Sequence, residues 1–134
     1  MGGSGYSFED LEVYKAAREL RKKIYNLVKT LPSDEKHNLQ SQMKRAALSL
    51  TNNIAEGHGR YHFQENIQYL RQSRGSLEEL IDDLNACLDE KYIGEQEVES
   101  LKEESYGLLK KLNGYGAYLR KRKIQNLNEQ HRIS

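Results

Sequence analysis

The sequence predicts an all-α protein, folded as an antiparallel up-down-up-down four-helix bundle. Three observations predict this class. Apolar residues recur at steps of three and four through four segments, no stretch sustains the alternation typical of strands, and short loops with proline or glycine separate the segments. The 134 residues suffice for one core but not for two. Two helical hairpins exchanged between subunits would give the same pattern.

The first predicted helix begins at Ser7 and ends before Pro32. Ser7 can cap the helix, the acidic residues after it favour the helix dipole, and a proline disfavours helical geometry in the residue before it. The apolar seam of this helix is Val13, Ala17, Leu20, Ile24, Leu27 and Leu31. The stripe is widened by Leu11, Tyr14, Tyr25 and Val28. This helix therefore has apolar surface for more than one neighbour.

The second predicted helix is capped by Ser33 or Asp34 and ends at the glycines of residues 57–59. Its seam is Leu39, Met43, Ala46, Leu50 and Ile54. The third begins near Tyr61 and ends in the turn at residues 92–94. Its seam is Phe63, Ile67, Leu70, Arg74, Leu77, Ile81, Leu84 and Leu88.

The fourth predicted helix begins near Glu95, and its periodicity fades beyond Arg122. Its seam is Val98, Leu101, Ser105, Leu108, Leu112, Tyr115 and Leu119. We therefore expect an expression scar over residues 1–5, a four-helix bundle over residues 6–122, and a basic, flexible C-terminal tail over residues 123–134.

Charge is nearly balanced in sum but segregated along the chain. Residues 1–77 carry a formal charge of +4, residues 78–104 carry −9, and residues 105–134 carry +6. Separate blocks of opposite sign suit a charged partner or contact between copies of the chain. Alternatively, acidic and basic helices lie side by side in one bundle and neutralise each other.

Several function classes find no support in the sequence. A single cysteine, Cys87, excludes an internal disulfide and suits a reducing, cytoplasmic location, and no apolar run approaches the roughly 20 residues of a membrane span. No phosphate-cradling glycine motif, nucleophile elbow or zinc signature is present. His58 and His62 have metal-ligand spacing, but glycines interrupt the helix between them. We therefore expect no catalytic residue, no cofactor and no metal.

Arg74 occupies a seam position of the third helix, where an apolar side chain is expected. A buried guanidinium without a partner is costly, so Arg74 needs an acceptor. The candidate acceptors are Glu12, Glu19, Asn52, Asn53 and a neighbouring subunit. As an anchor, Arg74 would mark a subunit or ligand site. Alternatively, it extends to solvent at the edge of the bundle.

Two other groups of residues depart from simple helix chemistry. Asn52, Asn53 and Glu56 form a polar stripe on the second helix, which can fix the register of the bundle, cap loop backbone or bind a partner. Gly107 and Gly114 lie seven positions apart on one face of the fourth helix. They indicate close approach of another helix, or else a weak, kinked helix.

Basic side chains cluster on the first helix, on the second, and most densely on the fourth. The candidate nucleic-acid-binding residues are Arg18, Arg21, Lys22, Lys23, Lys44, Arg45, Arg60, Lys110, Lys111, Arg120, Lys121, Arg122 and Lys123. They can form an edge that contacts phosphates, and oligomerisation would multiply it. The alternative for residues 120–123 is a solubilising role, since cations suit the last turn of a helix.

Four stretches resemble a known bacterial family. They are FEDLEVY at residues 8–14, QMKRAALSL at 42–50, NIAEG at 53–57 and SRGSLEEL at 73–80, within a match from about residue 6 to 119. The family consists of four-helix bundles encoded in 23S ribosomal RNA intervening sequences. The sequence also resembles the accessory variability proteins of diversity-generating retroelements. Thr51 stands where many relatives carry a proline, which should leave the second helix straighter.

The resemblance implies an antiparallel bundle that assembles into a ring-like homopentamer. Its retroelement branch implies binding of a reverse transcriptase and template RNA without catalysis. The leading hypothesis is a non-enzymatic, oligomeric accessory protein that contacts RNA or an RNA–DNA hybrid through its basic residues. The alternative is a protein-interaction scaffold that docks partners through acidic residues 78–104.

Overall fold

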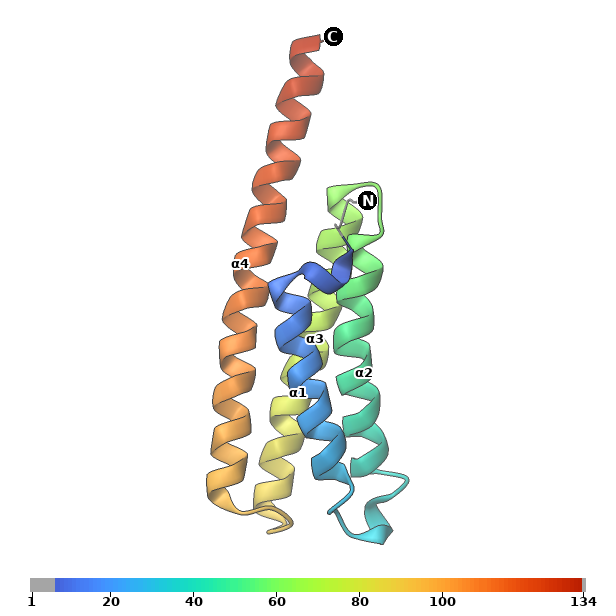
Figure 1. The fold of residues 1–134 in the computed structure, drawn as a ribbon, viewed down its shortest axis with the longest axis vertical. Helices are drawn as coiled ribbons and strands as arrows, with labels where there is room; N and C mark the ends of the chain where they lie inside the picture. Colours follow the sequence, from blue (N-terminus) through green and yellow to red (C-terminus); the bar gives the residue numbers. More distant parts are fainter. Residues whose placement is uncertain (1–6, 134) are drawn as a thin grey trace.

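The computed structural model describes residues 7–133, and all regular structure in that part of the chain is helical. Four long helices run alternately up and down and pack side by side (Figure 1). They are α1, Glu12–Val28; α2, Leu39–His58; α3, Phe63–Asp89; and α4, Glu95–Ile133. The predicted four-helix bundle is confirmed. The expression scar expected at residues 1–5 lies outside the described residues.

The chain enters the bundle through a separate turn, so α1 begins later than predicted. Ser7 caps a 3-10 turn, η1 (Phe8–Asp10): its hydroxyl accepts a hydrogen bond from the amide of Glu9 at 3.0 Å, and its own amide donates to the Asp10 carboxylate at 3.2 Å. Leu11 is extended, with φ −68° and ψ 132°. The helix cannot continue through this residue, and α1 starts at Glu12.

The start of α2 also lies later than the predicted caps. Ser33–Glu35 form a second 3-10 turn, η2, and α2 begins only at Leu39. Gln40 ties the connection to the helix, because its amide nitrogen donates to the carbonyls of Leu31 and Pro32 at 3.1 Å each. The predicted end is close to the observed one: α2 ends at His58, with Gly59 as its C-cap.

The predicted seams form the core, with one exception on α3. The fully buried side chains include Leu20, Ile24, Met43, Leu50, Ile54, Leu77, Leu84, Val98 and Leu112. Ser73, not Arg74, faces inward: its hydroxyl is fully buried against α2 and donates to the Leu50 carbonyl at 2.8 Å. Arg74 is exposed, so the seam shifts by one position there.

Residues 123–133, which were expected to form a flexible tail, are part of α4. Residues 123–133 continue the helix, and its last turns extend past the ends of the other three helices (Figure 1). Neither glycine nor proline interrupts this stretch. Lys123 Nζ donates to Gln64 Oε1 at 2.5 Å, and the Arg122 guanidinium lies 5.9 Å from the centre of the Phe63 ring. The start of α3 thus supports α4 where the apolar period fades.

No helix within residues 7–133 is both long enough and apolar enough to cross a membrane.

Candidate nucleic-acid interface

Four of the basic side chains predicted to bind nucleic acid are engaged with carboxylates of the same chain. The ion pairs are Lys22–Glu19 at 3.1 Å, Lys23–Glu104 at 2.6 Å, Arg45–Glu79 at 3.0 Å and Arg60–Glu56 at 2.9 Å. The hydrogen bond to Glu104 raises the pKa of Lys23. Two of these pairs join different long helices, which supports local neutralisation of part of the acidic block.

Arg21 and Lys44 also have contacts inside the bundle. Arg21 Nη1 donates to Thr51 Oγ1 at 2.7 Å, and the buried Thr51 hydroxyl donates in turn to the Leu48 carbonyl at 3.1 Å. Lys44 Nζ lies 5.7 Å from the centre of the Tyr25 ring. These contacts link α1 to α2, so both side chains have a structural role.

The lysines and arginines of α4 differ from those in the ion pairs because no carboxylate of the described residues forms an ion pair with them. Lys110, Lys111, Arg120 and Lys121 are exposed. Within residues 7–133, none of these four side chains forms an ion pair. Arg18 on α1 is likewise exposed. Exposed cations without an ion pair among the described residues therefore lie along α4 from Lys110 onward, and at Arg18 on α1.

Charge separates along the long axis of the molecule. The acidic residues 78–104 span the end of α3, the turn and the start of α4, beside the end of the bundle that also holds the α1–α2 connection (Figure 1). The basic residues beyond 105 lie toward the opposite end, where α4 projects. A polyanion would be attracted to the projecting end and repelled from the other.

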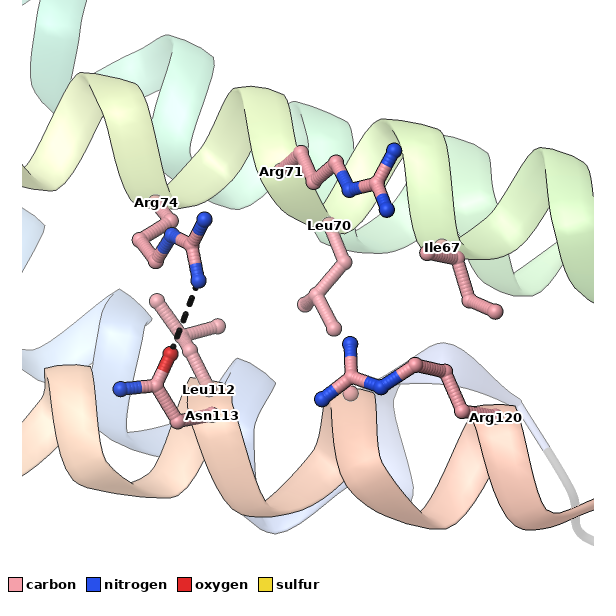
Figure 2. Close-up of a pocket in the computed structure, with 8 residues that line it drawn as sticks. Ile67, Leu70, Arg71, Arg74, Leu112, Asn113 and Arg120 are labelled. Atoms are coloured by element: carbon pink, nitrogen blue, oxygen red, sulfur yellow. Dashed lines mark hydrogen bonds between the residues drawn. The ribbon is translucent and has the colours of Figure 1, made fainter.

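Three arginines meet in a groove between α3 and α4 (Figure 2). Arg71 and Arg74 come from α3 and Arg120 from α4, around a cavity of about 140 Å³. Arg74 Nη1 donates to Asn113 Oδ1 at 3.2 Å. This amide on α4 accepts from Arg74, and none of the acceptors predicted within the chain, Glu12, Glu19, Asn52 and Asn53, does so. The signal was available: counting equal distances from the α3–α4 turn brings residue 74 within about one turn of residue 113.

Gly116 makes room for this groove. A Cβ atom at this buried position would lie 3.2 Å from Leu70 Cδ2 and 3.4 Å from Arg120 Nη1. Glycine therefore eases the packing of α4 against Leu70, beside the Arg120 guanidinium, which faces α3 in Figure 2. Nothing in the sequence indicated this role for Gly116, and Arg74 was not among the candidate nucleic-acid-binding residues.

The predicted polar stripe on α2 divides into two parts. Asn53 Nδ2 donates to the carbonyl and the hydroxyl of Ser49, at 2.9 and 3.0 Å, and Ser49 accepts from Ser76 of α3 at 3.0 Å. These bonds support a register role for Asn53. Asn52 and Glu56 instead line a shallow depression with Arg60.

Gly107 and Gly114 lie on an exposed face of α4. A Cβ atom at either position would meet nothing within 4 Å. No helix among the described residues approaches them, so close packing within the chain does not explain these glycines. Exposed Tyr106 and Tyr118 lie on the same helix.

The described residues hold no metal-like cluster and no activated thiol. No group of three or more His, Cys, Asp or Glu side chains gathers within residues 7–133 as a metal site would require. Cys87 is buried, and desolvation raises the pKa of its thiol to about 11. A thiol with this pKa is a poor nucleophile at neutral pH.

Comparison with known proteins finds a matching family model and a solved structure with a similar fold. A family model described as 23S rRNA-intervening sequence protein matches residues 9–114. The crystal structure of a protein with unknown function from the S23 ribosomal protein family of Bacteroides thetaiotaomicron has a TM-score of 0.73 and 24% sequence identity. That match covers 78% of this chain and 95% of the other. No curated protein matches the chain.

Proposed function

The chain belongs to the family of 23S rRNA-intervening sequence proteins, and from that premise we propose that it is a non-enzymatic, oligomeric accessory protein that binds RNA. The contact surface would be α4 from Lys110 to Lys123, where exposed cations have no carboxylate partners among the described residues. Binding would be electrostatic and largely independent of sequence, because phosphate contacts carry affinity but no base readout.

The single observation that supports this proposal most is the contrast between the two sets of cations. Those on α1 and α2 are partly neutralised by carboxylates, as in the Lys23–Glu104 and Arg45–Glu79 pairs. Those at Lys110, Lys111 and Lys121 have no such partner in the described part of the chain. Exposed cations without carboxylate partners repel one another, and the phosphates of an RNA backbone would relieve this repulsion.

Assembly would enlarge this surface. We propose a homo-oligomer, a pentamer by family resemblance, whose contacts include the exposed face of Gly107 and Gly114. A partner of the retroelement type would be a reverse transcriptase with its template RNA or an RNA–DNA hybrid, held by the basic residues.

A second function is favoured by the opposite end of the molecule. Residues 78–104 carry a formal charge of −9, and only Glu79 and Glu104 of this block form ion pairs among the described residues. This acidic end would suit a basic protein partner, in which case the chain acts as an interaction scaffold without direct RNA contact.

Equilibrium binding to a single-stranded RNA tests the first proposal. The variant R120Q/K121Q/R122Q/K123Q removes four charges from exposed or partly exposed side chains of α4. We expect it to lose at least about tenfold in affinity at low salt, equally for RNAs of different sequence.

The matched control is K15Q/K29Q/K36Q/K91Q, which removes the same charge from exposed lysines elsewhere. It should change the affinity by less than about twofold. Equal losses in both variants would refute a defined RNA surface on α4. Absence of RNA binding by the unmodified protein, together with tight binding of a basic protein, would favour the scaffold.

A further inference from the structure

We infer that the groove between α3 and α4 is a phosphate-binding site, in which Arg71, Arg74 and Arg120 together hold one phosphate group. This inference deepens the proposed function and rests on it for the source of the phosphate. It assigns a ligand to Arg71 and Arg74, two α3 residues outside the basic edge of α4.

Arg71, Arg74 and Arg120 line one cavity of about 140 Å³, and they come from two helices that pack against each other (Figure 2). At about 30 Å³ for each water molecule, this volume is of the order needed for a tetrahedral anion. A groove with walls on two helices also limits the directions from which an anion can be contacted.

The positive charge of these three arginines is not balanced by carboxylates of the described residues. Within residues 7–133, none of the three arginines forms an ion pair. In the described part of the chain, their one hydrogen-bonded side chain is the neutral amide of Asn113, whose oxygen accepts a bond from Arg74. Three like charges brought together without a carboxylate repel each other, and an anion between them removes that repulsion.

The floor of the groove is apolar. Ile67, Leu70 and Leu112 are buried and apolar there, and Gly116 exposes no side chain. Apolar walls lower the local dielectric, which strengthens a charge-assisted hydrogen bond. A Cβ atom at Gly116 would lie 3.2 Å from Leu70 Cδ2, so the glycine eases the packing of α4 against Leu70 at the floor of the groove.

Guanidinium chemistry selects phosphate among anions. Each planar fork can give two parallel hydrogen bonds to two oxygens. Inorganic phosphate and a terminal phosphate offer enough oxygens for several forks, whereas a carboxylate or a backbone phosphodiester offers two. The phosphate can come from the RNA backbone, from an RNA 5′ end or from free inorganic phosphate.

Calorimetric titration with inorganic phosphate at constant ionic strength tests the site without RNA. We expect R71Q/R74Q to weaken binding at least about tenfold, and K29Q/K36Q, which removes two charges at the far connection, to leave it within about twofold. R71K/R74K keeps the charge but loses the forks, so it should also weaken binding by about fivefold or more. Phosphate binding that is unchanged in R71Q/R74Q, or fully preserved in R71K/R74K, would overturn the inference.

Two RNAs of one sequence, with a 5′ phosphate or a 5′ hydroxyl, identify the source. Tighter binding of the phosphorylated RNA that disappears in R71Q/R74Q assigns the groove to a 5′ end, and equal weakening of both RNAs assigns it to the backbone. If both RNAs bind R71Q/R74Q as well as the unmodified protein, the groove has no part in RNA binding and the inference fails while the proposed function stands. Phosphate binding with no RNA binding would instead refute the proposed function alone.

Discussion

Asp83 is a buried carboxylate on α3 whose environment disfavours its charge. It is 7% exposed, and one of its oxygens has no hydrogen-bond partner among residues 7–133. Desolvation, with repulsion from Glu79 and Asp82, raises its pKa from 3.8 to about 6, while Arg45 opposes the shift. Since the folded chain holds this proton more tightly than the unfolded chain, the contribution of Asp83 to stability falls as pH rises from about 4 to about 6 and stays low above.

The variant D83N should therefore be more stable than the unmodified protein at neutral pH. Its advantage in the free energy of unfolding should grow by about 1–2 kcal/mol between pH 4 and pH 7, a value reduced for partial access of solvent. Urea denaturation of both proteins across this range measures the difference. An advantage that does not vary with pH would contradict the charge penalty.

At the scale of the elements, two glycines of adjacent helices have opposite roles. Gly57 lies inside α2 where α3 approaches: a Cβ atom there would lie 2.6 Å from Asn66 Oδ1 and 2.9 Å from Tyr69 Cβ. Gly75 lies inside α3, and a Cβ atom there would meet nothing within 4 Å. Gly57 is thus required by packing, whereas Gly75 only weakens its helix.

We expect G57A to destabilise the bundle by about 1–3 kcal/mol, because α3 must move away from α2. The matched variant G75A should stabilise it by up to about 1 kcal/mol, since alanine favours the helix. Thermal denaturation of the two variants beside the unmodified protein distinguishes these effects. A stable G57A variant would show that the two helices can separate without cost.

Helix periodicity predicted the elements well but not their ends or their polar contacts. The seams at Leu20, Leu50 and Leu84 are buried as expected, because their spacing alone sets one face inward. The sequence predicts that the glycines at the end of α2 stop the helix, but the missing side chain at Gly57 also lets α3 pack closely against α2. Local sequence carries no information on which helix lies opposite.

The groove was only partly predictable from the sequence, because equal distances from the α3–α4 turn bring residue 74 near residue 113 but do not place the side chain of Arg120. Arg71 and Arg74 lie about one turn apart on α3, and only the antiparallel pairing of α3 and α4 brings Arg120 of α4 to the same groove. The helical end of α4 was missed because the contacts of Lys123 and Arg122 with Gln64 and Phe63 are tertiary.

For the molecule as a whole, the exposed glycine face of α4 bears on assembly. The variant G107A/G114A adds two methyl groups that the single chain can accommodate. If a second copy packs there, as we propose, the variant should form a smaller species in light scattering while its helix becomes more stable. G75A, also in open space, should keep the assembly of the unmodified protein. An unchanged mass for G107A/G114A would exclude this face from the interface.

The bundle as a whole is a rod with an acidic end and a projecting basic end (Figure 1). This distribution of charge would attract RNA to α4 and repel it from the α3–α4 turn. The affinity would depend on the number of phosphates contacted.

The most direct test of this claim is the slope of RNA affinity against salt concentration on logarithmic axes. The account predicts a steep fall, by about 0.7 for each phosphate contacted on a single strand, and a shallower slope for R120Q/K121Q/R122Q/K123Q. An affinity that does not change with salt, or no binding even at low salt, would contradict it.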